Sequence, residues 1–208
     1  MKTVKIGNQE WMSENLNVDH YQNGDPIPEV KDAREWESLK TGAWCNYNNN
    51  PENGTKHGKL YNWYAVNDPR GLAPEGWYIP RFTEFLRLAT RINLDDNALK
   101  SVGRVSRWTA GYNINGFSSL MSGHRSCNGT FHDLYSSSYF WSSTTFGPIS
   151  ANSINLYSDE GINIYKIPYD KTFGFSIRCL RDQLPIYALK HSGMSYENII
   201  NWESGMGA

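Results

Sequence analysis

The residues best suited to bind another molecule lie between positions 145 and 172. This stretch is crowded with asparagine, serine, tyrosine, isoleucine, aspartate and glycine, and apolar segments flank it at 139–144 and 173–179. Tyrosine offers a large contact area at low entropic cost, and asparagine and serine adapt their hydrogen bonds to a partner. Polar residues held between two buried strands are typical of a binding surface on a rigid frame. We therefore predict a binding surface over residues 145–172.

Alternation along this stretch indicates which side chains face outward. Ile154 and Leu156 should point inward, because successive side chains of a strand face opposite sides, and Ile162 and Ile164 likewise. Asn152 breaks this alternation, so it must precede the strand or lie at a bulge. The outward side chains should be exposed together on one surface, although ordinary strand surface without a ligand is the alternative. The candidate ligand-binding residues are Asn152, Asn155, Tyr157, Asp159, Asn163, Tyr165 and Tyr169.

The cysteines do not form a catalytic arrangement. Cys127 lies in a polar loop and Cys179 in a strand expected in the core, with no second thiol placed to pair with Cys127 and no setting that lowers the pKa of a thiol. We therefore expect no enzyme. The three cysteines show no metal-binding spacing, and they are either small buried hydrophobes or include one Cys45–Cys179 disulfide.

Metal sites are equally weak in the sequence. His124 and His132 lie eight positions apart with Asp133 nearby, which permits a zinc or hydrolytic site, but solvated loop histidines are the simpler interpretation. Residues 95–97 and 159–161 carry acids that could contact calcium, yet neither segment has the spacing of a calcium loop. We predict no cofactor, with calcium as the alternative.

Composition excludes several classes of protein. The 208-residue chain has a net charge of −1 and neither a basic block nor an acidic tail, so we expect no nucleic-acid partner. It has no apolar run of about 18 residues, so no membrane span is expected. No signal peptide is visible, so the protein is not secreted by that route or the sequence belongs to a longer precursor. Eight tryptophans and thirteen tyrosines favour a loop-rich fold with a core of large rings.

The elements that would position the binding surface can be read from periodicity. Residues 4–12 predict a hairpin turning at Gly7, residues 32–39 a short helix capped by Asp32, residues 82–92 a strong helix, and residues 93–100 a second one. Short strands are expected at 43–47, 115–120, 124–125, 130–131, 139–143, 153–157 and 173–179, and a loop at 48–54. The apolar blocks predict one shared core of Trp11, Trp44, Trp63, Trp77, Trp141, Phe85 and Phe175, although a sugar-stacking platform within residues 44–80 is the alternative for some of these rings.

The last residues differ from the rest of the chain. We expect a domain over residues 1–182 and an extension over residues 183–208. A short helix could place four apolar side chains on one side of the extension: Tyr196, Ile199, Ile200 and Trp202. An exposed apolar strip favours a partner or a homo-oligomer contact, and a tail folded back on its own domain is the alternative.

Several spaced blocks resemble one family over residues 3–182, the Fibrobacter succinogenes major paralogous domain. They lie at residues 3–17, 44–45, 58–66, 72–80, 116–118, 123–125, 140–144 and 175–179. The helix start at residues 81–85 departs from the family pattern, and residues 183–208 lie past its usual end.

The resemblance implies an α+β, C-type lectin-like fold of the formylglycine-generating-enzyme type, with small antiparallel sheets, two helices and much irregular structure. Similar domains occur in surface proteins of gut bacteria and as variable proteins of diversity-generating retroelements, including phage tail adhesins. In the latter, exposed positions between the Trp-Ser-Ser-Thr block and the final Arg-Cys are rewritten, which corresponds here to residues 145–172. Calcium is suggested by fold analogy alone, because the sugar-binding motifs of calcium-dependent lectins are absent.

We therefore expect a ligand-binding module, an adhesin or receptor-binding domain that recognises a protein or glycan on a cell surface. The resemblance places it on the bacterial cell surface or on a phage virion. A structural or interaction domain without a dedicated site is the main alternative, and a cryptic enzyme is the third.

Overall fold

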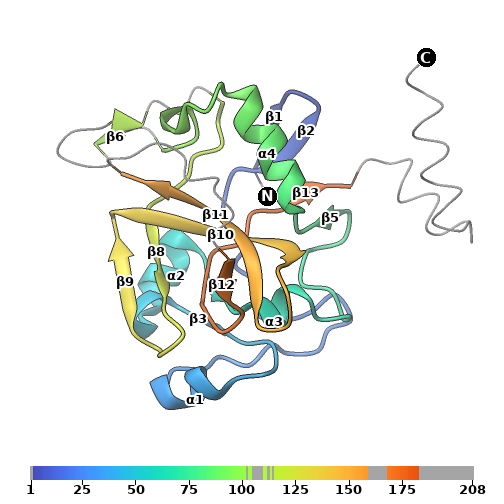
Figure 1. The fold of residues 1–208 in the computed structure, drawn as a ribbon, viewed down its shortest axis with the longest axis vertical. Coiled ribbons are helices and arrows are strands. Elements are labelled where there is room, and N and C mark those ends of the chain that lie inside the picture. The colour runs from blue at the N-terminus through green and yellow to red at the C-terminus, as the bar shows by residue number, and fades with distance from the viewer. Residues whose placement is uncertain are drawn as a thin grey trace, which may run out of the picture.

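The computed structural model describes residues 2–101, 103–104, 110–111, 113, 115–158 and 168–182 of the chain. The fold is mixed α+β, as predicted. Two sheets of four and five strands hold most of the regular structure, and helices and long loops surround them (Figure 1).

The four-stranded sheet joins the two ends of the domain. β1 (Thr3–Ile6) and β2 (Gln9–Met12) form the predicted hairpin, with Gly7 at φ 61° in the turn. β13 (Leu180–Arg181) pairs with β2 on one side and with β5 (Trp77–Tyr78) on the other, and all these pairings are antiparallel. The beginning and the end of the domain are therefore bound to each other through backbone hydrogen bonds.

The five-stranded sheet has the order β12-β11-β10-β8-β9. Its long strands β10 (Ser137–Thr145) and β11 (Ser150–Tyr157) are antiparallel and place Tyr139 opposite Asn155. β8 joins β10 in parallel, so this sheet is mixed and not purely antiparallel as expected. The remaining strands are β8 (Ser122–Arg125), β9 (Phe131–Leu134) and β12 (Pro168–Asp170).

Four α-helices are described, where the family resemblance implies two: α1 (Ala33–Ser38), α2 (Pro51–His57), α3 (Trp63–Val66) and α4 (Phe82–Arg91). The predictions for α1 and α4 are confirmed, and Asp32 Oδ1 caps α1 by accepting the N–H of Glu35 at 2.9 Å. The described residues of 93–100 contain a 3₁₀ turn instead of a second helix. Short elements complete the fold: β3 (Trp44–Cys45) with β4 (Leu60–Tyr61), β6 (Gly103–Arg104) with β7 (Ala110–Gly111), and 3₁₀ turns at Tyr47–Asn49 and Asp96–Ala98.

Helix α2 replaces part of the loop predicted at 48–54. Pro51 occupies its first turn, where a missing N–H leaves no intrahelical bond unmade. Asn50 caps the helix, because its Oδ1 accepts the N–H of Glu52 at 3.0 Å. The proline and glycine of this segment therefore lie at the start and inside a short capped helix.

Residues 173–179 do not form the regular strand that the sequence predicts. They run from the five-stranded sheet to the four-stranded sheet, and successive residues pair with different segments. The single bridges are Gly174 with Arg125, Phe175 with Tyr61, and Ser176 with Phe140. Regular pairing begins at β13, where the chain reaches the four-stranded sheet.

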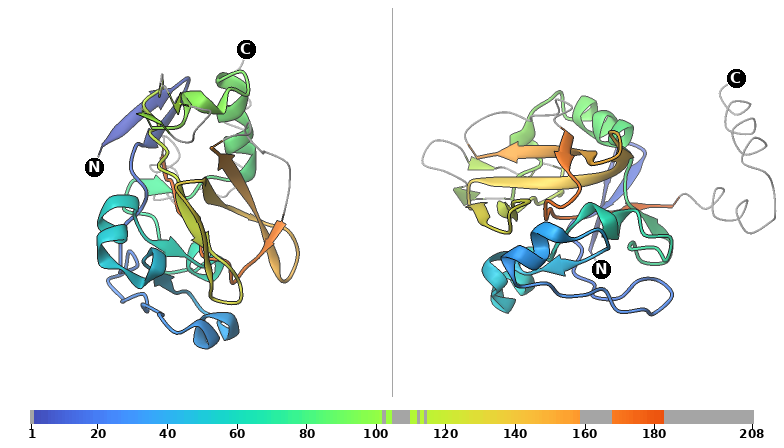
Figure 2. Two further views of the ribbon diagram at one scale, coloured as in Figure 1. Left: turned by 90° about the vertical axis from the view of Figure 1, so that its left-hand side faces the viewer. Right: turned by 60° about the horizontal axis from the view of Figure 1, so that its bottom comes forward.

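The predicted tryptophan core is buried, but it is divided into two clusters. Trp11 packs against Phe85 of α4, with ring centroids 5.2 Å apart. Trp141 packs against Phe175 at 4.4 Å, in a cluster that also contains Trp44, Trp63 and Trp77. The five-stranded sheet separates the clusters: in the right-hand view of Figure 2, α4 lies on one side of β10 and β11, and α1 and α2 lie on the other.

Arg125 is a fully buried cation that joins loops together. Its guanidinium lies 4.4 Å from the ring centroid of Trp36 and 4.9 Å from that of Phe131. It donates to the backbone carbonyls of Val30, Lys31, Asp32 and Gly129. Carbonyl acceptors and aromatic faces thus replace water around a buried charge.

Arg178 is held in the same way on the other side of the fold. It is 1% exposed, and its guanidinium lies 4.4 Å from the ring centroid of Phe117. It donates to Asn15 Oδ1 at 2.7 Å and to the carbonyls of Met12 and Phe117. Burial lowers the pKa of Arg178 from its usual value. The arginines of the 123–125 and 175–179 blocks therefore have structural roles.

Candidate ligand-binding site

Strand β11 has the predicted alternation of side chains. Ile154 and Leu156 are buried in the cluster that contains α4. Asn155 and Tyr157 lie on the opposite side, where Asn155 contacts Tyr157 and Tyr169. The prediction of which side chains share a side is therefore confirmed for these residues.

The predicted exposure is wrong for two of the asparagines. Asn155 is 2% exposed, because its amide lies beneath the hydroxyl groups of Tyr157 and Tyr169, which are themselves half-buried. Asn152 is 4% exposed, because it lies in β11 between β10 and β12; its backbone carbonyl accepts the hydroxyl of Ser142 at 2.8 Å. The other candidates lie outside the described residues: Asp159, Asn163 and Tyr165.

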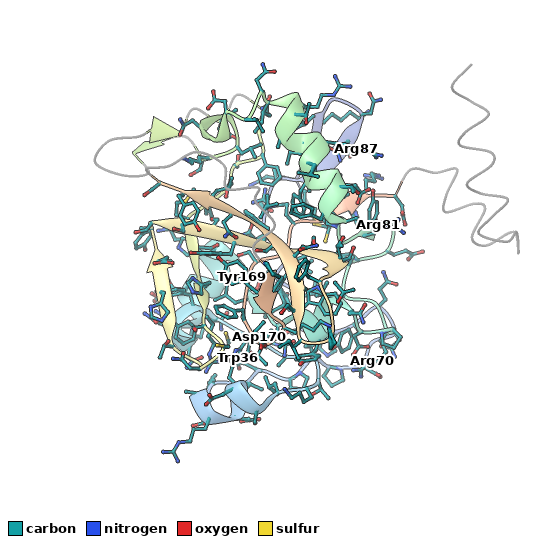
Figure 3. All side chains as sticks on the ribbon, in the orientation of Figure 1. Trp36, Arg70, Arg81, Arg87, Tyr169 and Asp170 are labelled. Carbon is teal, nitrogen blue, oxygen red and sulfur yellow. The ribbon has the colours of Figure 1, made fainter. Side chains whose placement is uncertain are left out.

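A polar and aromatic surface forms on this side of the five-stranded sheet, and we call it the tyrosine face. It is built almost entirely by the strands of that sheet, and Figure 3 shows Tyr169 on β12 close to β10 and β11. Its members are His124, Asp133, Tyr139, Asn155, Tyr157, Tyr169 and Phe173.

Asn155 fixes the two outer tyrosines. Its Nδ2 donates to Tyr169 Oη at 3.0 Å and to Tyr157 Oη at 3.4 Å. Its Oδ1 accepts the hydroxyl of Ser153 at 3.2 Å. One buried amide therefore holds two half-exposed hydroxyl groups in place.

Tyr139 lies at the centre of the face. Its ring centroid is 6.2 Å from that of Tyr157 and 6.0 Å from that of Tyr169, and both pairs are edge-on. Phe175 stacks beneath it at 5.0 Å, and Phe173 contacts Tyr169 at 5.2 Å. Such offset and edge-to-face contacts are favourable, so the rings support one another in a fixed arrangement.

Asp133 brings a carboxylate to the face, and its side chain is 39% exposed. Its Oδ2 accepts the hydroxyl of Tyr139 at 2.9 Å and lies 3.3 Å from Nδ1 of His124, without the geometry of a hydrogen bond. Burial lowers the pKa of His124 to about 4, although Asp133 acts in the opposite direction. His124 is therefore neutral at pH 7, and the short distance is not an ion pair there.

The hydroxyls of Tyr139 and Tyr169 stay protonated at neutral pH. Burial and the hydrogen bond to Asp133 raise the pKa of Tyr139. Burial, followed by the charge of Tyr157, raises the pKa of Tyr169 to about 12. The face therefore offers hydroxyl groups, ring surfaces and one carboxylate.

From the sequence, we did not predict Tyr139 or Phe173 as site residues. His124 and Asp133 were considered there only for a zinc or hydrolytic site. Within the described ranges, no three histidine, cysteine or acidic side chains are grouped to hold a metal ion. Alternation along β10 could have placed Tyr139, because it shares a side with Trp141. No sequence signal brings Asp133 of β9 to Tyr139, because that contact depends on how β8 joins β10.

A separate hollow of about 520 Å³ lies beside β5, and none of the tyrosine face lines it. Its walls include Val18, Tyr21, Leu72, Trp77, Tyr78 and Asp182. Cys127 and His124, the residues that would suit an enzyme, are absent from these walls.

The three cysteines are free, so the alternative of a Cys45–Cys179 disulfide is wrong. Cys45 and Cys179 are buried, as small hydrophobic residues are, whereas Cys127 is partly exposed. Burial raises the pKa of Cys45 and of Cys179 to about 12, so both thiols stay protonated at neutral pH.

The fold and this face define a small mixed α+β domain with a half-buried tyrosine cluster on one sheet. The chain belongs to the Fibrobacter succinogenes major domain family, whose model matches residues 4–181, and this confirms the family part of the resemblance. No curated protein and no solved structure matches the chain. Among the described helices, none combines the length and the apolar character needed to cross a membrane.

Proposed function

We propose that this domain is a ligand-binding module that recognises a protein or glycan on a cell surface through the tyrosine face. The observation that carries the proposal is the pair of half-buried tyrosines, Tyr157 and Tyr169, whose hydroxyls share the amide of buried Asn155. Large side chains that are already fixed lose little entropy when a partner binds.

The resemblance supports a more specific proposal. We propose a C-type lectin-like fold and a diversified surface over residues 145–172, as in variable proteins of diversity-generating retroelements. The domain would then act in an adhesin or a phage tail protein, at the bacterial cell surface or on a virion. A reverse transcriptase gene nearby with a repeat copy of residues 140–180 would support it; the absence of both would contradict diversification.

Binding to an array of cell-surface glycans and proteins tests the proposed role of the face. The test variant changes Tyr157 and Tyr169 to Ala, and the matched control changes Tyr135, an exposed tyrosine that contacts α2, to Ala. Loss of array binding in the double variant alone would support the proposal. Unchanged binding by a folded double variant would place recognition elsewhere.

A structural or interaction domain without a dedicated site is the second candidate. The burial of Asn152 and Asn155 favours it, because the amide of Asn155 is already used within the fold. A domain that binds nothing on the array and whose face variants only lose stability would fit this alternative. We do not propose an enzyme, and the protonated thiols of Cys45 and Cys179 are consistent with that choice.

Residues 183–208 lie outside the described residues, and their proposed partner or homo-oligomer contact stays a prediction. The contact would use Tyr196, Ile199, Ile200 and Trp202. If the extension joins copies of the chain, deleting it should lower the number of copies per particle, which light scattering measures as molar mass. An unchanged oligomeric state would reject the contact between copies.

A further inference from the structure

Basic side chains lie over aromatic rings in many parts of this domain, but not on the tyrosine face. Lys171 lies 4.6 Å from the ring centroid of Trp63, and Arg70 lies 4.1 Å from that of Tyr21. No described lysine or arginine lies over the ring of Tyr139, Tyr157, Tyr169 or Phe173. Within the part of the chain that the structure describes, no lysine or arginine therefore covers the electron-rich faces of these rings.

The charged groups of the face also favour a cationic ligand. The side chain of Asp133 is 39% exposed, and its hydrogen bond from Tyr139 uses one of its two oxygens. His124 beside it is neutral at pH 7. No lysine or arginine belongs to the face as defined by its described residues. An anionic ligand would be repelled here, whereas a cation would meet a carboxylate and π-electrons together.

The interior of the same domain shows which cation suits such surroundings. Arg125 lies against Trp36 and Phe131, and Arg178 lies against Phe117 and Phe140. In both places the guanidinium lies over a ring while its N–H groups donate to carbonyl or amide oxygen atoms. The tyrosine face likewise offers ring surfaces, and the carboxylate of Asp133 supplies the acceptor oxygens in place of carbonyl and amide oxygens.

We propose that the tyrosine face binds an arginine side chain of a protein partner. The guanidinium would stack on Tyr157 or Tyr169 and donate to the carboxylate of Asp133. Tyr139 links these parts, because its hydroxyl donates to Asp133 while its ring lies 6.2 Å and 6.0 Å from the other two. A guanidinium fits better than a lysine ammonium, because it is flat, weakly hydrated and able to donate twice to one carboxylate. This inference rests on the proposed function, since it names the ligand chemistry of the same face.

The test is an NMR titration at pH 8 with three short capped peptides that differ in one residue: arginine, uncharged citrulline or lysine. The side-chain amide of Asn155 is the reporter, because it bonds both outer tyrosines. We expect saturable shifts with the arginine peptide and at least tenfold weaker binding of the citrulline and lysine peptides. Equal binding of the citrulline peptide would overturn the role of charge, and equal binding of the lysine peptide would overturn the choice of guanidinium.

Asp133→Asn should weaken binding of the arginine peptide at least tenfold. Asparagine tolerates the positive φ of 66° at this position, so the variant should keep the fold. Glu37→Gln removes an exposed carboxylate from α1 and serves as the matched control, which should bind normally. Equal affinity of both variants would overturn the proposal. If the arginine peptide fails but array binding still requires Tyr157 and Tyr169, the inference is wrong while the proposed function stands.

Discussion

The two sides of the five-stranded sheet use neighbouring residues of the same strands for different purposes. On the α4 side, Phe140, Ile154 and Leu156 are at most 2% exposed and form part of an apolar cluster. On the other side, Tyr139 and Asn155 combine ring contacts with hydrogen bonds that reach half-exposed groups. The α4 side is therefore core, whereas the opposite side combines core rings such as Trp141 and Phe175 with the half-exposed edge of the tyrosine face. The outer residues of that face, such as Tyr157, should change with less effect on stability.

The largest expected effect is on the α4 side. Phe140→Ala should cost roughly 3–5 kcal/mol of unfolding free energy, because Phe140 is fully buried and packs on Phe117 at a centroid distance of 6.0 Å. Tyr157→Phe, on the tyrosine face, should cost about 1 kcal/mol, since it removes one partly exposed hydrogen bond. Urea denaturation measures both. Equal costs would show that the two sides do not differ in this respect.

Acid should destabilise the tyrosine face through His124. Burial lowers its folded-state pKa to about 4, below the unfolded value near 6.5, so its contribution is complete above about pH 6.5 and is lost as pH falls toward 4. A difference of this size corresponds to about 3 kcal/mol at 1.36 kcal/mol per pKa unit. Asp133 and His132 face the ring with opposite influences on its pKa, and Tyr139 packs edge-on against it.

Urea denaturation at pH 7 and pH 4 tests this expectation. His124→Gln should reduce the difference in stability between the two pH values by about 3 kcal/mol. His20→Gln, which changes an exposed histidine paired with Asp19 at 2.7 Å, should change that difference much less. If both variants behave alike, His124 is not the group responsible.

Removing the amide beneath the tyrosines should have an intermediate effect. Asn155→Ala should cost about 1–3 kcal/mol, because it leaves the hydroxyls of Ser153 and Tyr169 without a partner. It should also weaken any ligand binding of the face more than Tyr157→Phe does, since two rings lose their support. Thermal denaturation and the array measure the two effects. Full retention of binding would mean that Asn155 does not position the tyrosines.

The smallest effect is expected at the turn between β10 and β11, which belongs to neither side. Phe146 and Ile149 are 53% and 67% exposed, while Lys171 Nζ holds the turn through the carbonyls of Gly147 and Pro148 at 3.1 and 2.9 Å. Changing Phe146 and Ile149 to Ser should alter stability by no more than about 0.5 kcal/mol per residue. A larger fall in melting temperature would show that another surface covers this turn in solution.

Local pattern in the sequence determined the elements with strong periodicity or capping. The hairpin of β1 and β2, the cap of Asp32 on α1, and the apolar side of α4 all depend on residues within a few positions of one another. Alternation likewise assigned Ile154 and Leu156 to one side of β11 and Asn155 and Tyr157 to the other. The family also followed from the sequence, because its blocks recur in order along the chain.

Exposure and long-range contacts were decided by the tertiary structure. A period of two says which side of a strand a residue faces, but not whether another segment covers that side. Asn155 is buried because β12 brings Tyr169 over it, and Asp133 reaches Tyr139 because β8 pairs in parallel with β10. Neither pairing leaves a local signal, since the free energy that selects it comes from packing between segments distant in the chain.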